Sequence, residues 1–256
     1  MSQARFAIIL YTVREPAKED LVGTLKKVRE SGFEYVQWSG MPEMPAEQAR
    51  KALDQAGLTA VAGHMSIVPF EEDFEQTLAF WRTLGVTDIA PGGMMKDCKD
   101  SLEDWRRGCG RLDAVGAKLQ EAGIRLSYHN HNHEFEKFPD DDRCKLDILY
   151  EETDPQHVRA ELDLGWCHAG GADPAAYIRK YAGRCPVVHA KDMKADPKEG
   201  ECRFAELGKG VLDWDPIFEA GEQAGIEWYI YEQDQTDGDL WESVQTSHDF
   251  LKSRLG

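Results

Sequence analysis

The chain has 256 residues, with 30 Lys and Arg against 47 Asp and Glu, so its formal net charge is −17 at pH 7. This acidic excess argues against a nucleic-acid partner or an anionic membrane surface, because both need clustered Lys and Arg. Hydrophobic residues make up 41% of the chain and include seven Trp, which is enough for a sizeable core. No window approaches the roughly 20 apolar residues that span a bilayer.

The six cysteines are scattered and form no CxxC pair. We therefore expect reduced, mostly buried thiols in a cytoplasmic protein. The N-terminal run MSQARFAIILYTVREP is followed by acidic residues and by no small-residue cleavage site, so it predicts a first strand and not a signal peptide.

Apolar, β-branched or aromatic runs alternate along the chain with stretches of helical spacing. We predict strands at residues 5–11, 34–38, 59–66, 86–90, 124–131, 158–163, 187–190 and 226–232. We predict the helices that follow them at 18–31, 46–56, 71–84, 102–122, 145–152, 174–182, 215–224 and 240–251. Eight strand–helix pairs predict an α/β fold with a single (β/α)8 barrel over residues 1–256, and a doubly wound open sheet is the rival. The loop at 193–210 is a candidate lid.

Four successive predicted strands end in side chains that bind metals. They end in the phrases YHNHNHEFE, ELDLGW, VVHAKD and YIYEQD, which supply His129, Asp163, His189 and Glu232. The active site of such a barrel lies at the carboxyl ends of its strands. Imidazole and carboxylate ligands together suit Mn, Co, Fe, Ni or Zn, so we predict one divalent metal ion at these four residues. Mn or Zn is favoured, and Mg is retained as a further option.

Other polar and aromatic residues near strand ends are candidate substrate contacts. Period two in the fifth strand puts His131 on the same face as His129, and His64 ends the third strand. Trp38 and Trp166 each follow a strand end, where an indole ring can stack on a sugar. Packing in the core or at its rim remains an equal alternative for both tryptophans, and a solvated loop remains an alternative for each single histidine.

Several phrases resemble the sugar phosphate isomerase/epimerase family, the xylose isomerase-like TIM barrels of the AP endonuclease family 2 superfamily. They are GIRLSYHNHNHEFEKF, ELDLGWCHAGGADP, VVHAKDMK, LGKGVLDW and YIYEQD, and the resemblance extends over essentially the whole chain. It implies one metal ion held from strands five to eight, with Asp163, His189 and Glu232 as the last three ligands. The epimerases carry a Glu where this chain has His129, a departure shared by relatives with YHNH. Trp166 also departs, because the epimerases have a substrate-contacting His there.

These residues predict chemistry at a carbon next to a carbonyl group. Glu232 is the candidate base, Lys191 would stabilise the enolate oxygen, and Glu134 is a candidate second acid or base. The first hypothesis is a metal-dependent isomerase or epimerase of a small sugar or keto-sugar that forms an enediolate. The alternative is a lyase or dehydratase acting on 3-keto-glycosides or inososes. An abasic-site endonuclease and a non-catalytic sugar-binding barrel are weaker hypotheses. The expected partner is a small-molecule substrate, and a homo-oligomer is left open.

Overall fold

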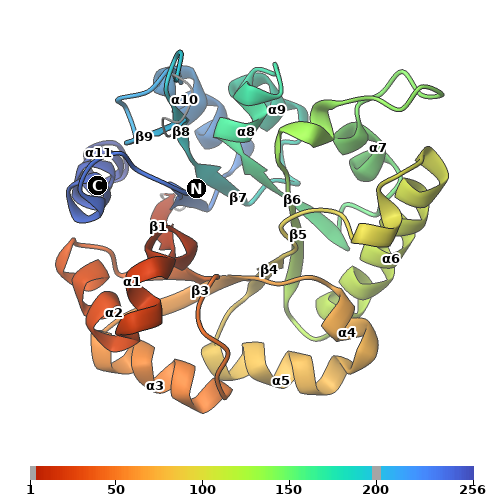
Figure 1. Cartoon of the computed structure of the whole chain (residues 1–256). Helices are drawn as coiled ribbons and strands as arrows, with labels where there is room; N and C mark the ends of the chain where they lie inside the picture. Colours follow the sequence, from red (N-terminus) through yellow and green to blue (C-terminus); the bar gives the residue numbers. More distant parts are fainter. Residues whose placement is uncertain (1–3, 198–202) are drawn as a thin grey trace.

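The computed structural model describes residues 4–197 and 203–256. Eight parallel strands form a closed barrel in chain order, and the last strand pairs with the first. Their bounds are β1 (Arg5–Ile9), β2 (Tyr35–Trp38), β3 (Thr59–His64), β4 (Asp88–Ala90), β5 (Arg125–His129), β6 (Val158–Asp163), β7 (Val187–Ala190) and β10 (Trp228–Tyr231). The predicted (β/α)8 barrel is confirmed, and the open sheet is wrong because β1 and β10 close the ring (Figure 1).

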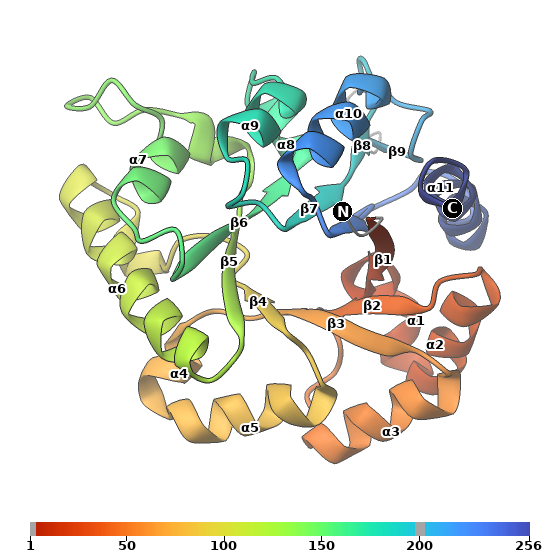
Figure 2. The ribbon, with the colours of Figure 1, turned by 180° about the vertical axis from the view of Figure 1, so that it is seen from behind.

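Helices surround the strands, and α11 lies between α10 and α1 in both views (Figures 1 and 2). The α-helices are α1 (Arg14–Glu19), α2 (Leu21–Glu30), α3 (Ala46–Ala56), α4 (Val68–Glu72), α5 (Phe74–Leu84), α6 (Leu102–Glu121), α7 (Lys145–Glu151), α8 (Leu164–Ala169), α9 (Pro174–Lys180), α10 (Trp214–Ala224) and α11 (Leu240–Leu255). The 3-10 helices are η1 (Leu10–Val13), η2 (Lys96–Cys98) and η3 (Asn132–Phe135).

Two predicted helices are each split in two by an aspartate. Asp20 separates α1 from α2 and Asp73 separates α4 from α5, and both have extended backbone angles. Each carboxylate accepts a hydrogen bond from the backbone N–H three residues later, which caps the second helix. A short acidic side chain is favoured at such a cap, so one helix ends and the next begins at each aspartate.

A small hairpin follows β7 within the predicted lid. It pairs β8 (Asp192–Met193) with β9 (Phe204–Ala205) in antiparallel orientation, and residues 198–202 of the predicted lid lie outside the described residues. The buried Asp192 carboxylate accepts hydrogen bonds from the backbone of Gly208, Gly210 and Leu212 and from the Trp214 indole. The end of this loop is therefore anchored to the carboxyl end of β7.

The barrel interior changes character along its axis. Part of it is filled by small and apolar side chains, namely Ala7, Ile9, Ala62, Val187, Trp228 and Ile230. Towards the carboxyl ends of the strands it holds buried polar side chains, among them His129, Asp163 and His189. The larger apolar cluster lies between the strands and the surrounding helices.

The cysteines agree with the prediction where the structure describes them. Five are free and buried, namely Cys98, Cys109, Cys144, Cys167 and Cys185, whereas Cys202 lies outside the described residues. Among the described helices none has both the length and the apolarity needed to cross a bilayer.

Candidate metal centre and active site

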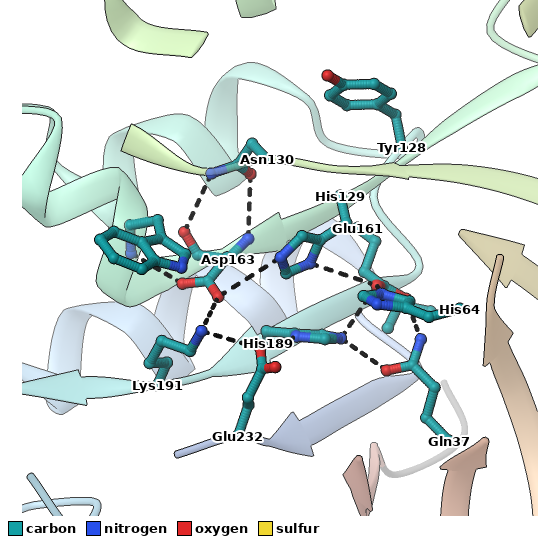
Figure 3. Close-up of polar contacts among 12 residues, drawn as sticks. Gln37, His64, Tyr128, His129, Asn130, Glu161, Asp163, His189, Lys191 and Glu232 are labelled. Carbon is teal, nitrogen blue, oxygen red and sulfur yellow. Dashed lines mark hydrogen bonds and ion pairs between the residues drawn. The ribbon is translucent and has the colours of Figure 1, made fainter. Parts of the chain in front are cut away.

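The four predicted metal ligands meet at the carboxyl end of the barrel. His129 ends β5, Asp163 ends β6, His189 lies within β7 and Glu232 follows β10. All four side chains are buried, and each offers one ligand atom within 4.8 Å of the others. The close-up shows them converging from four strands (Figure 3).

The separations within this cluster fit a single divalent ion. His189 Nδ1 lies 2.8 Å from Glu232 Oε2, and His129 Nε2 lies 3.8 Å from Asp163 Oδ2. Ligand atoms about 2.0–2.2 Å from a metal ion lie about 3–4 Å from each other, so little movement is required. Asp163 Oδ2 is buried and accepts no well-formed hydrogen bond from the described residues, although the Lys191 ammonium group lies 3.1 Å away, so this oxygen is available to a metal ion.

Local structure holds Asp163 in this orientation. Its Oδ1 accepts a hydrogen bond from the Trp166 backbone N–H at 2.8 Å and so caps α8, which leaves Oδ2 facing the cluster. Asn130 fixes the same residue from the end of β5, because its side-chain oxygen accepts from the Asp163 N–H at 3.1 Å. The beginning of α8 immediately after β6 therefore sets the direction of the ligand.

Lys191 occupies the space between the carboxylates. Its Nζ is 3.1 Å from Asp163 Oδ2, 3.0 Å from Glu232 Oε2 and 3.2 Å from Asp234 Oδ1, and the residue is 1% exposed. Burial alone would lower the Lys191 pKa, but these carboxylates raise it above its usual value. The ammonium group is thus the counter-ion of two candidate ligands.

Burial and charge divide the cluster into ionised and neutral groups. Burial opposes ionisation of Glu232, but Lys191 and His189 hold its pKa well below the usual value. Burial would also lower the pKa of His189, yet Glu161 and Glu232 raise it to about 10. Burial lowers the pKa of His129 well below the usual value, next to charged His189. His129 is therefore neutral and has a free lone pair, whereas His189 must release one proton to bind a metal ion.

Two further residues of the site lie one layer deeper and were not among the predicted site residues. Glu161 points inward two positions before Asp163, and Gln37 points inward from β2. Glu161 Oε1 lies 2.5 Å from His64 Nε2 and 3.0 Å from His189 Nε2. The alternation within ELD could have found Glu161, and a Gln inside the apolar strand YVQW could have found Gln37.

Three of the four predicted substrate contacts lie beside the cluster. The His64 ring stacks on His189 with centroids 5.2 Å apart, and the His131 ring lies 5.1 Å from His129 and 5.7 Å from the Trp166 ring. His131 Nδ1 and Trp166 Nε1 are both buried and have no hydrogen-bond partner within residues 4–197 and 203–256. These two atoms can bond to polar groups of a ligand.

The structure does not bring Glu134 or Trp38 to the cluster. The buried Glu134 carboxylate accepts hydrogen bonds at 2.8 Å from the Tyr128 hydroxyl and from the His131 backbone N–H, and it lies 3.1 Å from His133 Nε2. Tyr128 points away from the cluster (Figure 3). Glu134 therefore shapes the turn that carries His131. Trp38 is buried in the apolar cluster between the strands and helices.

A model of the xylose isomerase-like TIM barrel family matches residues 25–254, and the chain belongs to this family. Among curated proteins, an inosose dehydratase from Clostridium beijerinckii is 27% identical over 170 residues, which cover 60% of this chain and 56% of that protein. The chain thus spans about half the length of the curated relatives it matches.

Solved structures share the whole fold. A sugar phosphate isomerase/epimerase from Parabacteroides distasonis superposes with a TM-score of 0.83 at 19% identity, covering 99% of this chain and 95% of that one. The IOLI protein, solved with a bound zinc atom, superposes with a TM-score of 0.74 at 15% identity, covering 98% and 99%. At these identities the likeness shows the fold alone.

Proposed function

We propose that this protein is a metal-dependent enzyme that removes the proton next to the carbonyl group of a polyhydroxylated ketone and expels a neighbouring hydroxyl group as water. The observation that carries this proposal is the ionised base Glu232 beside Lys191, while the second predicted base, Glu134, is held outside the cluster by Tyr128. One base suffices for elimination, whereas the two-glutamate epimerases need a carboxylate on each face. The inosose dehydratases among the relatives support a keto-polyol as substrate.

His129, Asp163, His189 and Glu232 would hold the divalent ion, which as a Lewis acid would polarise the substrate carbonyl group. The zinc atom in the IOLI protein supports a divalent ion in a barrel of this fold. We propose manganese or zinc as the ion, because both bind mixed imidazole and carboxylate ligands.

Glu232 and Lys191 divide the proton chemistry. Burial raises the pKa of Glu232, but Lys191 and His189 lower it by more. The carboxylate therefore stays ionised and can accept the proton from carbon. The Lys191 ammonium group, 3.0 Å from Glu232, stabilises the negative charge that develops on the carbonyl oxygen. Glu232 then returns the proton to the departing hydroxyl group on the same face, so the products are an unsaturated ketone and water.

His131 and Trp166 bind the remaining hydroxyl groups. Each has a buried polar atom without a partner in the described part of the chain, and such atoms are costly unless a ligand satisfies them. The Trp166 ring also offers a flat apolar face next to Lys191, with the Lys191 Nζ 5.3 Å from the ring centroid. This combination of ring face and single polar atoms suits a sugar or cyclitol ring.

The second candidate function is isomerisation or epimerisation through the same enediolate. His131 favours it, because burial lowers the pKa of its imidazole and leaves a neutral ring whose Nδ1 is not hydrogen-bonded to any described residue. Such a ring can carry a proton on a face different from that of Glu232. Isomerisation keeps all atoms of the substrate, so product analysis separates it from loss of water.

The experiment compares wild type, Glu232→Gln and Glu227→Gln, each loaded with Mn²⁺, on inososes and keto-sugars in D2O. Glu227 precedes β10 at the opposite end of the barrel, pairs with Arg125 and is the matched control. We expect an enone product, with proton abstraction slowed about 10²–10⁴-fold in Glu232→Gln and unchanged in the control. Deuterated ketose without loss of water would favour the isomerase. Wild-type rates in Glu232→Gln would remove Glu232 from the base role.

A further inference from the structure

We infer that Glu161 is a positioning residue that acts through Gln37 to fix which nitrogen of His189 carries a proton, so that the other nitrogen is directed at the metal site. This inference rests on the metal centre of the proposed function. Glu161 does not belong to the four-ligand cluster of His129, Asp163, His189 and Glu232, but it lies beside it, next to His129 and His64 (Figure 3).

The two oxygens of Glu161 have different partners. Oε2 accepts a hydrogen bond from Gln37 Nε2 at 2.8 Å, and Oε1 lies 2.5 Å from His64 Nε2. An ionised carboxylate can only accept hydrogen bonds, so it dictates the orientation of its partners. Gln37 must therefore present its NH2 group to Glu161 and its oxygen to the other side.

That other side is His189. Gln37 Oε1 lies 2.7 Å from His189 Nε2, and Glu161 Oε1 lies 3.0 Å from the same nitrogen. Both oxygens are acceptors, so His189 Nε2 must carry a hydrogen. When His189 is neutral, the lone pair is on Nδ1, which lies 2.8 Å from Glu232 Oε2 within the four-ligand cluster. Outer hydrogen bonds of this kind fix the tautomer and ring orientation of metal-binding histidines.

The same carboxylate faces a third ring. His129 Nδ1 is buried, has no hydrogen-bond partner among the described residues and lies 3.5 Å from Glu161 Oε1, while His129 Nε2 faces Asp163. A small rotation of this ring would bring its Nδ1–H onto Glu161 and direct its Nε2 lone pair at the ion. One carboxylate is thus placed to orient both histidine ligands.

A second group of side chains is also close enough together to hold a metal ion, because its ligand atoms lie within 4.8 Å of one another. It consists of Glu161, His64, His129 and His189. The separations of 2.5 and 3.0 Å from Glu161 to two of the histidines are those of charge-assisted hydrogen bonds. An ion there in addition to the first would require His189 to bind through both nitrogens and to lose the hydrogen that Gln37 and Glu161 accept. The geometry therefore favours an orienting carboxylate over a second ion.

Exchanging the two side chains tests this mechanism. In Glu161→Gln, the new amide has one oxygen for two acceptor places. If its oxygen stays on Gln37 Nε2, its NH2 group faces His189 Nε2, and if the amide is reversed, Gln37 must reverse too and presents its own NH2 group there. Either arrangement disfavours the His189 tautomer needed for binding. The double variant Gln37→Glu with Glu161→Gln moves the carboxylate to position 37. There it accepts hydrogen bonds from the new amide at position 161 and from His189 Nε2, and so restores the acceptor pattern. Asp88→Asn is the matched control, because it neutralises another buried barrel carboxylate, paired with Arg125.

Zn²⁺ binding is measured in competition with a chromophoric chelator, without substrate, on variants whose folding is checked by circular dichroism. We expect one ion per chain in wild type, about 10–100-fold weaker binding in Glu161→Gln, recovery in the double variant and no change in Asp88→Asn. Wild-type affinity in Glu161→Gln, no recovery in the double variant, or two ions per chain would overturn the inference.

A second measurement does not depend on the variants' stability. Long-range 1H–15N NMR spectra of zinc-loaded wild type should show the His189 proton on Nε2, and a proton on Nδ1 would overturn the inference. Neither readout uses turnover. A chain that binds one ion as described but dehydrates no ketone therefore refutes the proposed reaction and leaves the role of Glu161 intact.

Discussion

Replacing Lys191 by Met is expected to destabilise the metal-free protein strongly and the metal-loaded protein much less. The Lys191 ammonium group lies 3.0–3.2 Å from carboxylate oxygens of Asp163, Glu232 and Asp234 and is 1% exposed. Met keeps an unbranched apolar stem but lacks the terminal ammonium group, so the substitution removes the charge and its three N–H donors. Three acidic groups then face one another without this cation, and breaking a buried pair in this way costs about 3–5 kcal/mol.

The size of the chain converts this energy into a melting temperature. At about 2.1 cal/mol/K per residue, unfolding of 256 residues has an entropy of about 0.5 kcal/mol/K. The loss therefore lowers the Tm by roughly 6–9 °C in the presence of a chelator. A divalent ion would place two positive charges among the same carboxylates, so the difference between variant and wild type should shrink when the ion is added.

Thermal unfolding followed by circular dichroism measures both values, first with chelator and then with Mn²⁺. Lys18→Met is the matched control, because Lys18 pairs with Glu15 at the exposed surface, where an ion pair contributes at most about 1 kcal/mol. Equal Tm values for wild type and Lys191→Met in chelator would refute the compensating role of the ammonium group. A deficit that Mn²⁺ leaves unchanged would show that the ion does not bind among these carboxylates.

Two further substitutions test buried carboxylates outside the metal site. Burial raises the pKa of Asp88 to about 7 despite Arg125 3.0 Å away, so between about pH 4 and 7 the folded protein retains a proton that the unfolded chain has lost. The stability of wild type should therefore fall by up to about 4 kcal/mol as the pH rises through this window, and urea unfolding of Asp88→Asn should lack that contribution; an unchanged slope would contradict the assignment. In Asp192→Asn, one carboxylate oxygen becomes an NH2 group, which cannot accept the hydrogen bonds of at least two backbone N–H groups that now donate to Asp192. We expect the free energy of unfolding, measured in urea, to fall by about 3 kcal/mol or more. The exposed helix cap Asp213→Asn should cost almost nothing, and equal losses in the two would contradict the anchoring role of Asp192.

The sequence was most informative where the fold repeats. Alternation of apolar strands and helices predicted eight strand–helix units, and the carboxyl-end rule then selected four polar strand ends. The convergence of His129, Asp163, His189 and Glu232 could be predicted in this way because each lies at or next to the end of a regular strand, where the direction of a side chain follows from period two. Closure of the barrel depends on pairing between β1 and β10, which are more than 200 residues apart in sequence.

Sequence reasoning was weakest where the strand ends and alternation no longer applies. Glu134 lies in η3, and only the three-dimensional position of the Tyr128 hydroxyl explains why its carboxylate turns outward. Gln37 and Glu161, in contrast, both lie inside regular strands. No local pattern predicts the hydrogen bond between them, because it crosses the barrel and joins residues 124 positions apart in sequence.

We expect one divalent ion to bind among His129, Asp163, His189 and Glu232. The most direct test is a crystal of the protein soaked with Mn²⁺ or Zn²⁺, in which anomalous scattering locates the ion. We predict a single peak per chain, about 2.0–2.2 Å from a nitrogen or oxygen atom of each of these four residues. No peak in this cluster, or a peak between His64 and Glu161 in its place, would contradict the account.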